Sequence, residues 1–320
     1  MNAASPERVP LGATAETISR VAFGCAAIGG HDYGAVDDEE SIDAIRAALE
    51  VGIDCFDTAD VYGLGHAEEV LGRALEGQRH RAFLATKVGI AFDTSGRTRR
   101  DASPQWIKRA VDSSLRRLRT DFIDLYQLHW PDPSRPLDEA LDTMMALRRA
   151  GKARHLGVCN LSPSMVLEAA RTTRFETIQV SYNVADWFDA EALRPVAEKH
   201  QLTVLTYNSL AQGLLTGKYG RESRFSGTDR RQRSGYFRGE KHETMLAAAA
   251  RIRAVASSRG RTCAQVAVRW ILDSWARSSA VVGIKHAAQA FEFGGTFGWR
   301  LASPELEVLR ELDDACHVNT

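Results

Sequence analysis

Four side chains that could together deliver a proton lie at or just after short strand-like runs of the chain: Asp57, Tyr62, Lys87 and His129. A phenol has an ordinary pKa of about 10, so it donates readily near neutrality only if a neighbouring ammonium lowers that pKa. Lys87 is the candidate ammonium, kept charged by Asp57, while His129 is placed to orient a carbonyl oxygen. This set predicts general acid catalysis on an oxyanion that forms as a carbonyl accepts hydride.

Each of these residues also has an ordinary structural explanation. A tyrosine after a strand most often packs, a lysine at a strand end is usually solvated, and an isolated histidine is mostly structural. A third possibility is that Lys87 forms a Schiff base, as lysines at strand ends do in barrel aldolases. The occurrence of all four residues at strand ends favours the acid catalyst.

The segments that must position these residues alternate between strand-like and helix-like patterns. Three of the expected helices begin with a serine and then a proline that suits the first helical position, at residues 103–104, 162–163 and 303–304. Asp37 and Glu40 resemble a capping box in front of a helix over residues 41–50, and a C-terminal helix is expected over 304–314. Eight strands are expected, at residues 21–23, 55–57, 83–86, 123–128, 155–158, 177–180, 203–206 and 280–282.

Eight strand–helix units in one chain predict an α/β fold of the (β/α)8 TIM-barrel type, with the active site at the carboxyl ends of the strands. We expect one domain over residues 1–320, with residues 1–15 as a loose N-terminal leader. Long βα loops are expected, above all the Arg-rich and Gly-rich segment 212–241, which is too polar to be core.

Composition narrows the class of protein. The 320 residues contain 41 Lys+Arg and 41 Asp+Glu, so the formal charge is zero and neither nucleic acid nor a membrane is an expected partner. The five cysteines are scattered without a CxxC pair, which is typical of reduced thiols in a cytoplasmic protein. No signal-like segment, membrane-length apolar run or metal-ligand spacing such as HExxH is present. The oligomeric state stays open.

Several stretches around the four residues resemble the aldo-keto reductase family. The most specific is DTADVYG at residues 57–63, and further matches occur at 85–89, 121–133, 151–160 and 210–219. The resemblance extends from about residue 16 to residue 315. It implies a (β/α)8 barrel that binds NADPH in an extended pose, with Asp57, Tyr62, Lys87 and His129 as the catalytic tetrad. It also implies that Tyr62 donates the proton in reduction and accepts it in oxidation.

The same resemblance implies a set of cofactor contacts. At the nicotinamide end these are Gly24, Cys25, Asp57, Cys159, Asn160, Gln179 and Tyr207. Towards the phosphates they are Asn208, Leu210, Lys218 and Arg224, and at the adenosine end Gly283, Lys285, Gln289 and Glu292. The chain departs from the family pattern where Ser209 replaces a usual proline and Phe293 a usual asparagine. Lys285 matches a residue near the adenosine 2′-phosphate, and a cation there favours NADPH over NADH.

Substrate choice in such barrels depends on the βα loops. The aromatic residues expected near the substrate are Tyr33, Phe92, Trp130 and Trp187, although Trp187 could equally cover the barrel edge. Glycines at 63 and 65 resemble the start of a dinucleotide fingerprint, but the third glycine is missing.

The sequence therefore predicts an NADPH-dependent reductase of a small aldehyde or ketone, such as a sugar or a specialised metabolite. Two alternatives remain at this point. One is a dehydrogenase that runs the reverse reaction on a sugar or alcohol. The other is a cofactor-binding, redox-sensing subunit, because potassium-channel β subunits resemble the same family.

Overall fold

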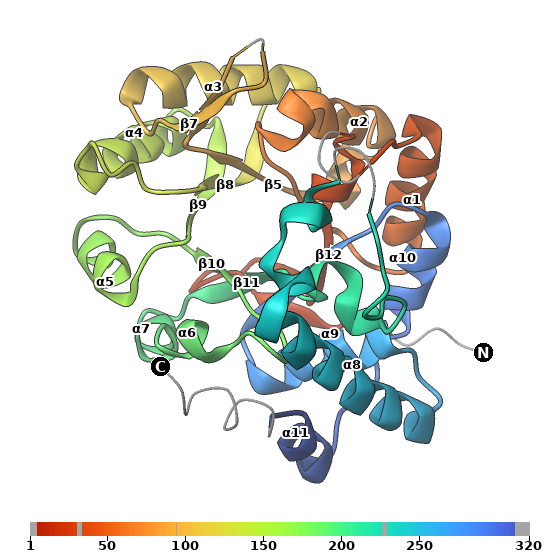
Figure 1. Cartoon of the computed structure of the whole chain (residues 1–320). Helices are drawn as coiled ribbons and strands as arrows, with labels where there is room; N and C mark the ends of the chain where they lie inside the picture. Colours follow the sequence, from red (N-terminus) through yellow and green to blue (C-terminus); the bar gives the residue numbers. More distant parts are fainter. Residues whose placement is uncertain (1–4, 31–33, 94, 226–228, 311–320) are drawn as a thin grey trace.

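The computed structural model describes residues 5–30, 34–93, 95–225 and 229–310. Eight parallel strands close into a barrel in the order β10-β11-β12-β3-β4-β5-β8-β9, and helices surround them (Figure 1). The fold is therefore the predicted (β/α)8 barrel. Its strands are β3 (Val21–Gly24), β4 (Cys55–Asp57), β5 (Phe83–Val88), β8 (Ile123–Leu128), β9 (Ala153–Cys159), β10 (Thr177–Ser181), β11 (Thr203–Tyr207) and β12 (Ser278–Gly283).

All eight predicted strands occur, and where their bounds differ the observed strand is the longer one. The difference matters at β5, which continues through Lys87 to Val88. Lys87 is in register with Gln127 of β8, so its backbone lies inside the sheet instead of in a loop. A residue whose backbone is paired on a barrel strand is held more precisely than one on a loop, which suits a catalytic role.

Helices α1, α3 and α5 begin where the sequence places capping side chains, whereas Ser303 is the first residue of α11. The Asp37 carboxylate accepts a hydrogen bond from the Glu40 amide at 3.0 Å, and the first helix starts at Asp38, three residues earlier than predicted. Ser103 and Ser162 cap the following amides in the same way. The helices are α1 (Asp38–Glu50), α2 (His66–Ala74), α3 (Pro104–Arg117), α4 (Leu137–Arg149), α5 (Pro163–Thr172), α6 (Phe188–Glu191), α7 (Arg194–Lys199), α8 (Gly239–Arg259), α9 (Cys263–Ser274), α10 (Ala287–Gly294) and α11 (Ser303–Arg310).

The prediction that residues 1–15 form a loose leader is wrong from residue 8 onwards. Strand β1 (Arg8–Pro10) pairs antiparallel with β2 (Thr17–Ser19), and Val9, Leu11 and Ile18 are buried against the barrel interior. The Gly12 amide also donates to Thr203 Oγ1 at the start of β11. The hairpin folds because these apolar side chains close the amino-terminal end of the barrel, a contact between segments far apart in the sequence.

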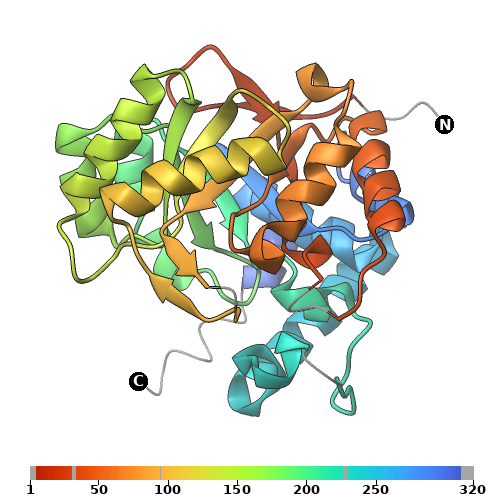
Figure 2. The same ribbon diagram turned by 90° about the horizontal axis from the view of Figure 1, so that it is seen from above.

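At the opposite end, the carboxyl ends of the strands carry two additions (Figure 2). A second hairpin, β6 (Ile90–Phe92) and β7 (Thr98–Arg100), follows β5 directly. In its described residues the Arg-rich segment contains three short helical turns, η4 (Ala211–Thr216), η5 (Arg230–Arg233) and η6 (Gly235–Phe237). The sequence suggested that this segment lies outside the core. That prediction is wrong in part, because Leu214, Leu215 and Tyr236 are buried.

None of the helices in the described part of the chain has the length and apolar character needed to cross a membrane.

Candidate active site

Lys87 lies at the centre of the predicted tetrad. Its Nζ donates to Asp57 Oδ1 at 2.5 Å and to the Thr58 carbonyl at 2.8 Å, and lies 3.4 Å from the Tyr62 hydroxyl. The lysine is only 1% exposed, so these contacts replace its hydration. Strands β4 and β5 are neighbours in the barrel, which is how residues 30 positions apart come to share one ion pair.

The second oxygen of Asp57 is held from across the barrel. It accepts hydrogen bonds from the side-chain amides of Gln179 at 2.8 Å and Gln127 at 3.2 Å. These amides fix the carboxylate so that its other oxygen faces Lys87. Gln127 was not among the predicted site residues. Its signal was a polar residue within the apolar run of β8, two positions before His129 and therefore on the same face of the strand.

His129 lies against Tyr62, with ring centroids 5.8 Å apart and the rings nearly perpendicular. Burial, and secondly the positive charge of Lys87, hold the pKa of His129 well below its ordinary value. Its Nδ1 is buried and has no hydrogen-bond partner among the described residues. The ring is therefore neutral at physiological pH and can orient a carbonyl oxygen without carrying a charge.

The pKa of Tyr62 is higher than the residue types alone predicted. Burial raises the pKa of Tyr62 to about 12; Lys87 opposes this rise, and Asp57 adds to it. Burial also lowers the pKa of Lys87, but the attraction of Asp57 outweighs this, and the net pKa of Lys87 is raised. The prediction that the pKa of Tyr62 is lowered overall is thus wrong, although Lys87 does act to lower this pKa, as expected. At neutral pH the site holds a protonated phenol beside a charged ammonium.

Two glycines shape the turn that carries Tyr62. Gly63 has φ +59°, and a Cβ there would lie 2.0 Å from the Gly29 carbonyl oxygen. Gly65 has φ +105° and packs beneath the side chain of Arg117. Any larger residue at either position would displace the turn, and the tyrosine with it.

A buried network joins this turn to the strand of Lys87. Arg117 of α3 pairs with Glu68 at 2.7 Å, and Glu68 accepts a hydrogen bond from Thr86 Oγ1 at 2.6 Å. Glu68 lies in the first turn of α2, directly after the turn that carries Tyr62, and Thr86 precedes Lys87 on β5. The network therefore holds the acid and the ammonium relative to each other.

Most of the residues expected at the nicotinamide end lie around the tetrad. Asn160 donates to the His129 carbonyl at 2.9 Å and accepts from the Tyr207 hydroxyl at 2.7 Å. Cys159 Sγ lies 3.4 Å from Gln179 Oε1, beside the amide that holds Asp57. Gly24 is in register with Asp57 on the neighbouring strand, and Cys25 follows it.

The turn after β11 is held by the residue that replaces the usual proline. Ser209 Oγ donates to the Val281 carbonyl, with an oxygen–oxygen distance of 2.9 Å, so the turn is anchored to β12 by a hydrogen bond. Asn208 adopts a left-handed φ of +54° and donates to Ser181 Oγ. Leu210 is the N-cap residue of η4 and directly precedes it. The expected pyrophosphate-side residues Asn208 and Leu210 thus lie on a defined turn at the mouth of the barrel.

Three cations gather where the sequence predicts phosphate contacts. The pKa of Lys285 is lowered by burial and by the charges of Arg231 and Lys218, while Asp229 opposes the shift. Arg231 is fixed by Asp229, with Nε 2.9 Å from Oδ1, and it also hydrogen-bonds to the Tyr219 hydroxyl. A set of mutually repelling cations is stabilised by a bound polyanion, so this donor set fits the phosphates of a dinucleotide.

The structure does not bring Arg224 to this cluster. Its side chain is mostly exposed and contacts Glu222 and the carbonyls of Arg221 and Ser223. Arg231, which was not among the predicted contacts, lies near Lys285 instead, and its charge helps to lower the pKa of that lysine. The available signal was an aspartate two residues before an arginine, Asp229 and Arg231, a spacing that lets one side chain orient the other.

The residues expected at the adenosine end have different environments in the structure. Gln289 Oε1 accepts hydrogen bonds from the amides of Lys285 and His286, so it caps α10. Phe293, where the family usually has asparagine, is 2% exposed and packs in the core. Gly283 ends β12, and Glu292 is half-buried on α10.

Two of the expected substrate residues lie after strands of the barrel: Phe92 is on β6, which follows β5, and Trp130 comes two residues after the end of β8. Phe92 packs edge-on against Trp106, with centroids 6.0 Å apart, and the Arg100 guanidinium lies 4.7 Å from the centroid of the Trp130 ring. Trp187 instead contacts Phe188, and Arg310 of α11 lies over its ring. Among the described residues, these ring contacts of Trp187 do not include a member of the tetrad. Tyr33 lies outside the described residues.

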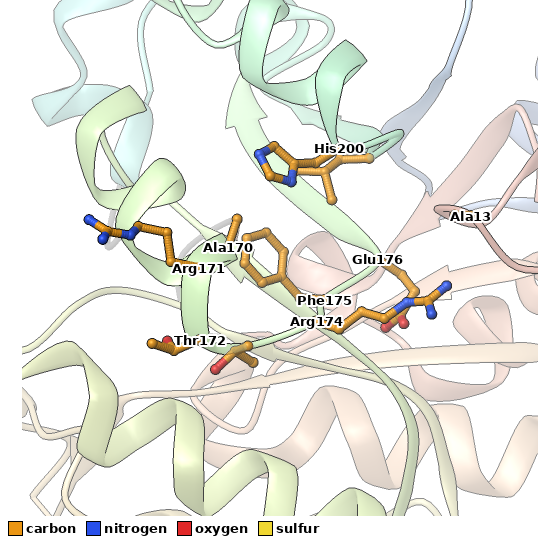
Figure 3. Close-up of a pocket in the computed structure, with 10 residues that line it drawn as sticks. Ala13, Ala170, Arg171, Thr172, Arg174, Phe175, Glu176 and His200 are labelled. Carbon is orange, nitrogen blue, oxygen red and sulfur yellow. The ribbon is translucent and has the colours of Figure 1, made fainter.

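A pocket of about 310 Å³ lies at the other end of the barrel (Figure 3). Arg174, Glu176, His200 and Ala13 line it, before the starts of β10 and β11 and beside the N-terminal hairpin. It is separate from the tetrad, which lies at the carboxyl ends. Within the described ranges, no three His, Cys, Asp or Glu side chains gather as metal ligands would.

Comparison with known proteins gives a consistent result. The model of the aldo/keto reductase family matches residues 20–314. Aldo-keto reductase YhdN of Bacillus subtilis is 38% identical over 290 residues, which is 90% of this chain and 87% of that protein. The glycerol dehydrogenase AKR11B4 from Gluconobacter oxydans superposes with a TM-score of 0.89 at 37% identity, covering 100% of this chain and 98% of that one. An aldo/keto reductase from Klebsiella pneumoniae, solved with NADP and acetate, has a TM-score of 0.75 at 29% identity, covering 96% and 95%.

Proposed function

The chain belongs to the aldo/keto reductase family of oxidoreductases, and we propose that it reduces an aldehyde or ketone to an alcohol with NADPH as hydride donor. The observation that carries this proposal is the chain of contacts from Asp57 through Lys87 to Tyr62, with a neutral His129 beside the phenol. A protonated phenol, a fixed positive charge and a neutral imidazole suit a carbonyl oxygen that gains negative charge.

In this mechanism each side chain has a separate task. The reduced nicotinamide, when bound, supplies hydride to the carbonyl carbon. Tyr62 donates its phenolic proton to the carbonyl oxygen, and the charge of Lys87 stabilises the phenolate that remains. Asp57, held by Gln127 and Gln179, keeps Lys87 in place, and His129 orients the carbonyl oxygen.

The cofactor contacts follow from the same geometry. Lys218, Arg231 and Lys285 would hold the phosphates, with Lys285 at the adenosine 2′-phosphate. Asn160 and Tyr207 would hold the nicotinamide end. The presence of NADP in the similar Klebsiella pneumoniae structure supports the choice of NADPH.

The proposal is tested by adding NADPH and a panel of aldehydes, ketones and keto sugars to the purified protein. The expected result is substrate-dependent loss of the reduced-nicotinamide absorbance and formation of the alcohol. Tight binding of NADPH without turnover of any carbonyl compound would instead favour a redox-sensing role.

A second candidate is the reverse reaction, oxidation of an alcohol, because the similar protein from Gluconobacter oxydans is a glycerol dehydrogenase. The same residues would serve, with Tyr62 accepting the proton as its phenolate. The ratio of kcat/KM in the two directions at neutral pH distinguishes these candidates.

The two directions are expected to depend differently on pH. Tyr62 must be protonated to donate, and its pKa is raised to about 12, so kcat/KM for reduction should be level between about pH 6 and 9. Oxidation needs the phenolate, so its kcat/KM should rise roughly tenfold per pH unit over the same range. Initial rates measured in both directions across that range check this, and a fall in reduction with an apparent pKa near 7 would exclude Tyr62 as the donor.

Replacing Lys285 with methionine is expected to raise the KM for NADPH by roughly 10- to 100-fold, the value of a charge-assisted contact to phosphate. The KM for NADH, which has no 2′-phosphate, should change less than about 3-fold. Arg221→Met is a suitable control because Arg221 pairs with the exposed Glu243 outside the cation cluster. Equal losses with both cofactors would mean that Lys285 does not contact the 2′-phosphate.

A further inference from the structure

We infer that Gln127 is a positioning residue of the proposed reaction, because its side-chain amide keeps the proton of the buried Asp57–Lys87 pair on the lysine. The positive charge beside Tyr62 then depends on residue 127. This inference rests on the proposed reductase function and adds to it a residue that determines the rate. The supporting observations are the burial of the pair, the two contacts of the amide and the packing that fixes its orientation.

The proton of the buried pair has two possible positions. Lys87 Nζ lies 2.5 Å from Asp57 Oδ1, and the two side chains are only 1% and 4% exposed. Because burial disfavours charge, the ionised pair competes with a pair in which the carboxyl holds the proton and the amine is neutral. Only the ionised pair places a cation 3.4 Å from the Tyr62 hydroxyl. Groups that stabilise the carboxylate therefore maintain the cation of the site.

Two amides stabilise this carboxylate, and both donate to Asp57 Oδ2. Gln179 of β10 does so at 2.8 Å and Gln127 of β8 at 3.2 Å. A hydrogen bond to the charged form of an acid favours that form. The family resemblance implies that Gln179 also contacts the nicotinamide, whereas it implies no cofactor contact for Gln127. The effect of Gln127 on the carboxylate can therefore be measured separately from cofactor binding.

The orientation of the Gln127 amide is fixed from two sides. Its Oε1 lies 3.8 Å from the Cys159 thiol, while its Nε2 faces Asp57. A reversed amide would direct its oxygen at the carboxylate and lose the thiol as donor. Gly157 is in register with Gln127 on the neighbouring strand β9, and a Cβ there would lie 3.0 Å from Gln127 Cγ (Figure 1). The missing side chain at residue 157 thus leaves the space that the glutamine fills.

An amide inside the barrel has a cost that its contacts offset. Gln127 is fully buried, and Leu125, two residues earlier on the same face of β8, is an apolar residue of the barrel interior. Barrel interiors are mostly filled by branched apolar side chains, and a buried amide lowers stability unless it is hydrogen-bonded. Both ends of this amide are bonded, one of them to a charged atom. These contacts assign Gln127 to the site and not to apolar packing.

The test uses two substitutions of Gln127 and one control. Gln127→Met has nearly the same length and removes the donor, whereas Gln127→Glu keeps a donor only while the introduced carboxyl is protonated. Thr177→Val is the control, because Thr177 is buried in the same interior and its hydroxyl has no partner among the described residues. Urea denaturation shows that each variant is folded and measures its unfolding free energy.

With NADPH and butanal, Gln127→Met should lower kcat by roughly 10-fold or more, the value of a hydrogen bond to a charged group. The Kd for NADPH, measured by fluorescence titration, should stay within about 3-fold of wild type, because the substitution acts on the carboxylate and not on the cofactor. Thr177→Val should keep kcat within about 2-fold of wild type.

The activity of Gln127→Glu should depend on pH in a way that wild type does not. The titratable groups around residue 127 are Asp57, Lys87, Tyr62 and Cys159. Burial and Asp57 raise the pKa of the introduced carboxyl, and Lys87 opposes this rise. The protonated carboxyl donates to Asp57 as the amide does, so kcat relative to wild type should be highest near about pH 5 and fall towards about pH 9. The same ratio for Gln127→Met should stay level.

The effect of Gln127 should disappear when Asp57 is neutral. In the Asp57→Asn background no proton is shared with Lys87, so adding Gln127→Met should change kcat by less than about 2-fold. A loss in that background as large as in the wild-type background would mean that Gln127 acts by another route, which overturns the inference.

Three further results would also overturn it. A lower unfolding free energy in Gln127→Met with unchanged kcat would show that the amide only supports the fold. Equal and pH-independent losses in Gln127→Met and Gln127→Glu would show that a donor at residue 127 is immaterial. A raised Kd for NADPH with unchanged kcat would make Gln127 a cofactor contact. Reduction of butanal by wild type keeps the proposed function standing in each case, whereas no reduction of any aldehyde or ketone would remove it together with the inference.

Discussion

Replacing Tyr62 with phenylalanine is expected to lower kcat for carbonyl reduction by roughly 10²- to 10⁴-fold, the usual contribution of a general acid. The phenylalanine ring fills the same space, so the turn between Gly63 and Gly65 should keep its shape. What is lost is the hydroxyl 3.4 Å from Lys87 Nζ, which is the proton source for the carbonyl oxygen. Steady-state rates with a small aldehyde measure the loss, and a fluorescence titration with NADPH should show binding within about 3-fold of wild type.

Tyr126→Phe is the matched control. Tyr126 is a fully buried phenol on β8, and its hydroxyl has no partner among the described residues. Removing that hydroxyl should leave kcat within about 2-fold of wild type. If the two variants lose the same activity, the effect comes from packing around buried phenols, and Tyr62 is not the acid.

Replacing Lys87 with methionine is expected to affect both activity and stability. The methionine leaves the Asp57 carboxylate buried without its cation, and removing one partner of a buried ion pair typically costs about 3–5 kcal/mol of unfolding free energy. Loss of the positive charge beside Tyr62 should also lower kcat by roughly 10²-fold or more, because the phenolate formed during reduction is no longer stabilised. Urea denaturation and steady-state kinetics measure the two effects.

The double variant Lys87→Met, Asp57→Asn separates these effects. Asparagine removes the unpaired charge, so much of the lost unfolding free energy should return. Activity should not return, because the ammonium that acts on Tyr62 is still absent. Recovery of activity in the double variant would mean that Lys87 serves only to neutralise Asp57, which contradicts the mechanism proposed above.

The barrel, and the approach of Asp57, Tyr62, Lys87 and His129 to one another, could be predicted because their signals are local. Each strand is a short apolar run, and Asp57, Lys87 and His129 stand at or next to the carboxyl ends of such runs. In a barrel of parallel strands these ends lie at the same mouth, and this arrangement does not depend on the conformation of the loops. The chemistry expected from the residue types therefore required no knowledge of the packing.

The corrections arise where distant segments or burial decide the outcome. The N-terminal hairpin is stable because Val9, Leu11 and Ile18 bury against residues far along the chain, which no local pattern shows. The raised pKa of Tyr62 reflects burial by the whole fold, which outweighs the nearby charge of Lys87. Which arginine of residues 221–238 lies near Lys285 depends on the path of that segment, and the family resemblance pointed to Arg224, whereas the structure has Arg231 there.

The most direct test of the account is a single turnover with NADPH that carries deuterium at the transferable position of the nicotinamide ring. Enzyme in excess over NADPH is mixed with a small aldehyde, and the product alcohol is examined by mass spectrometry. We predict one deuterium on the carbinol carbon, formed at least about 10²-fold more slowly by Tyr62→Phe. An alcohol without deuterium, or no alcohol from enzyme that binds NADPH, would contradict the assignment of this barrel as a carbonyl reductase.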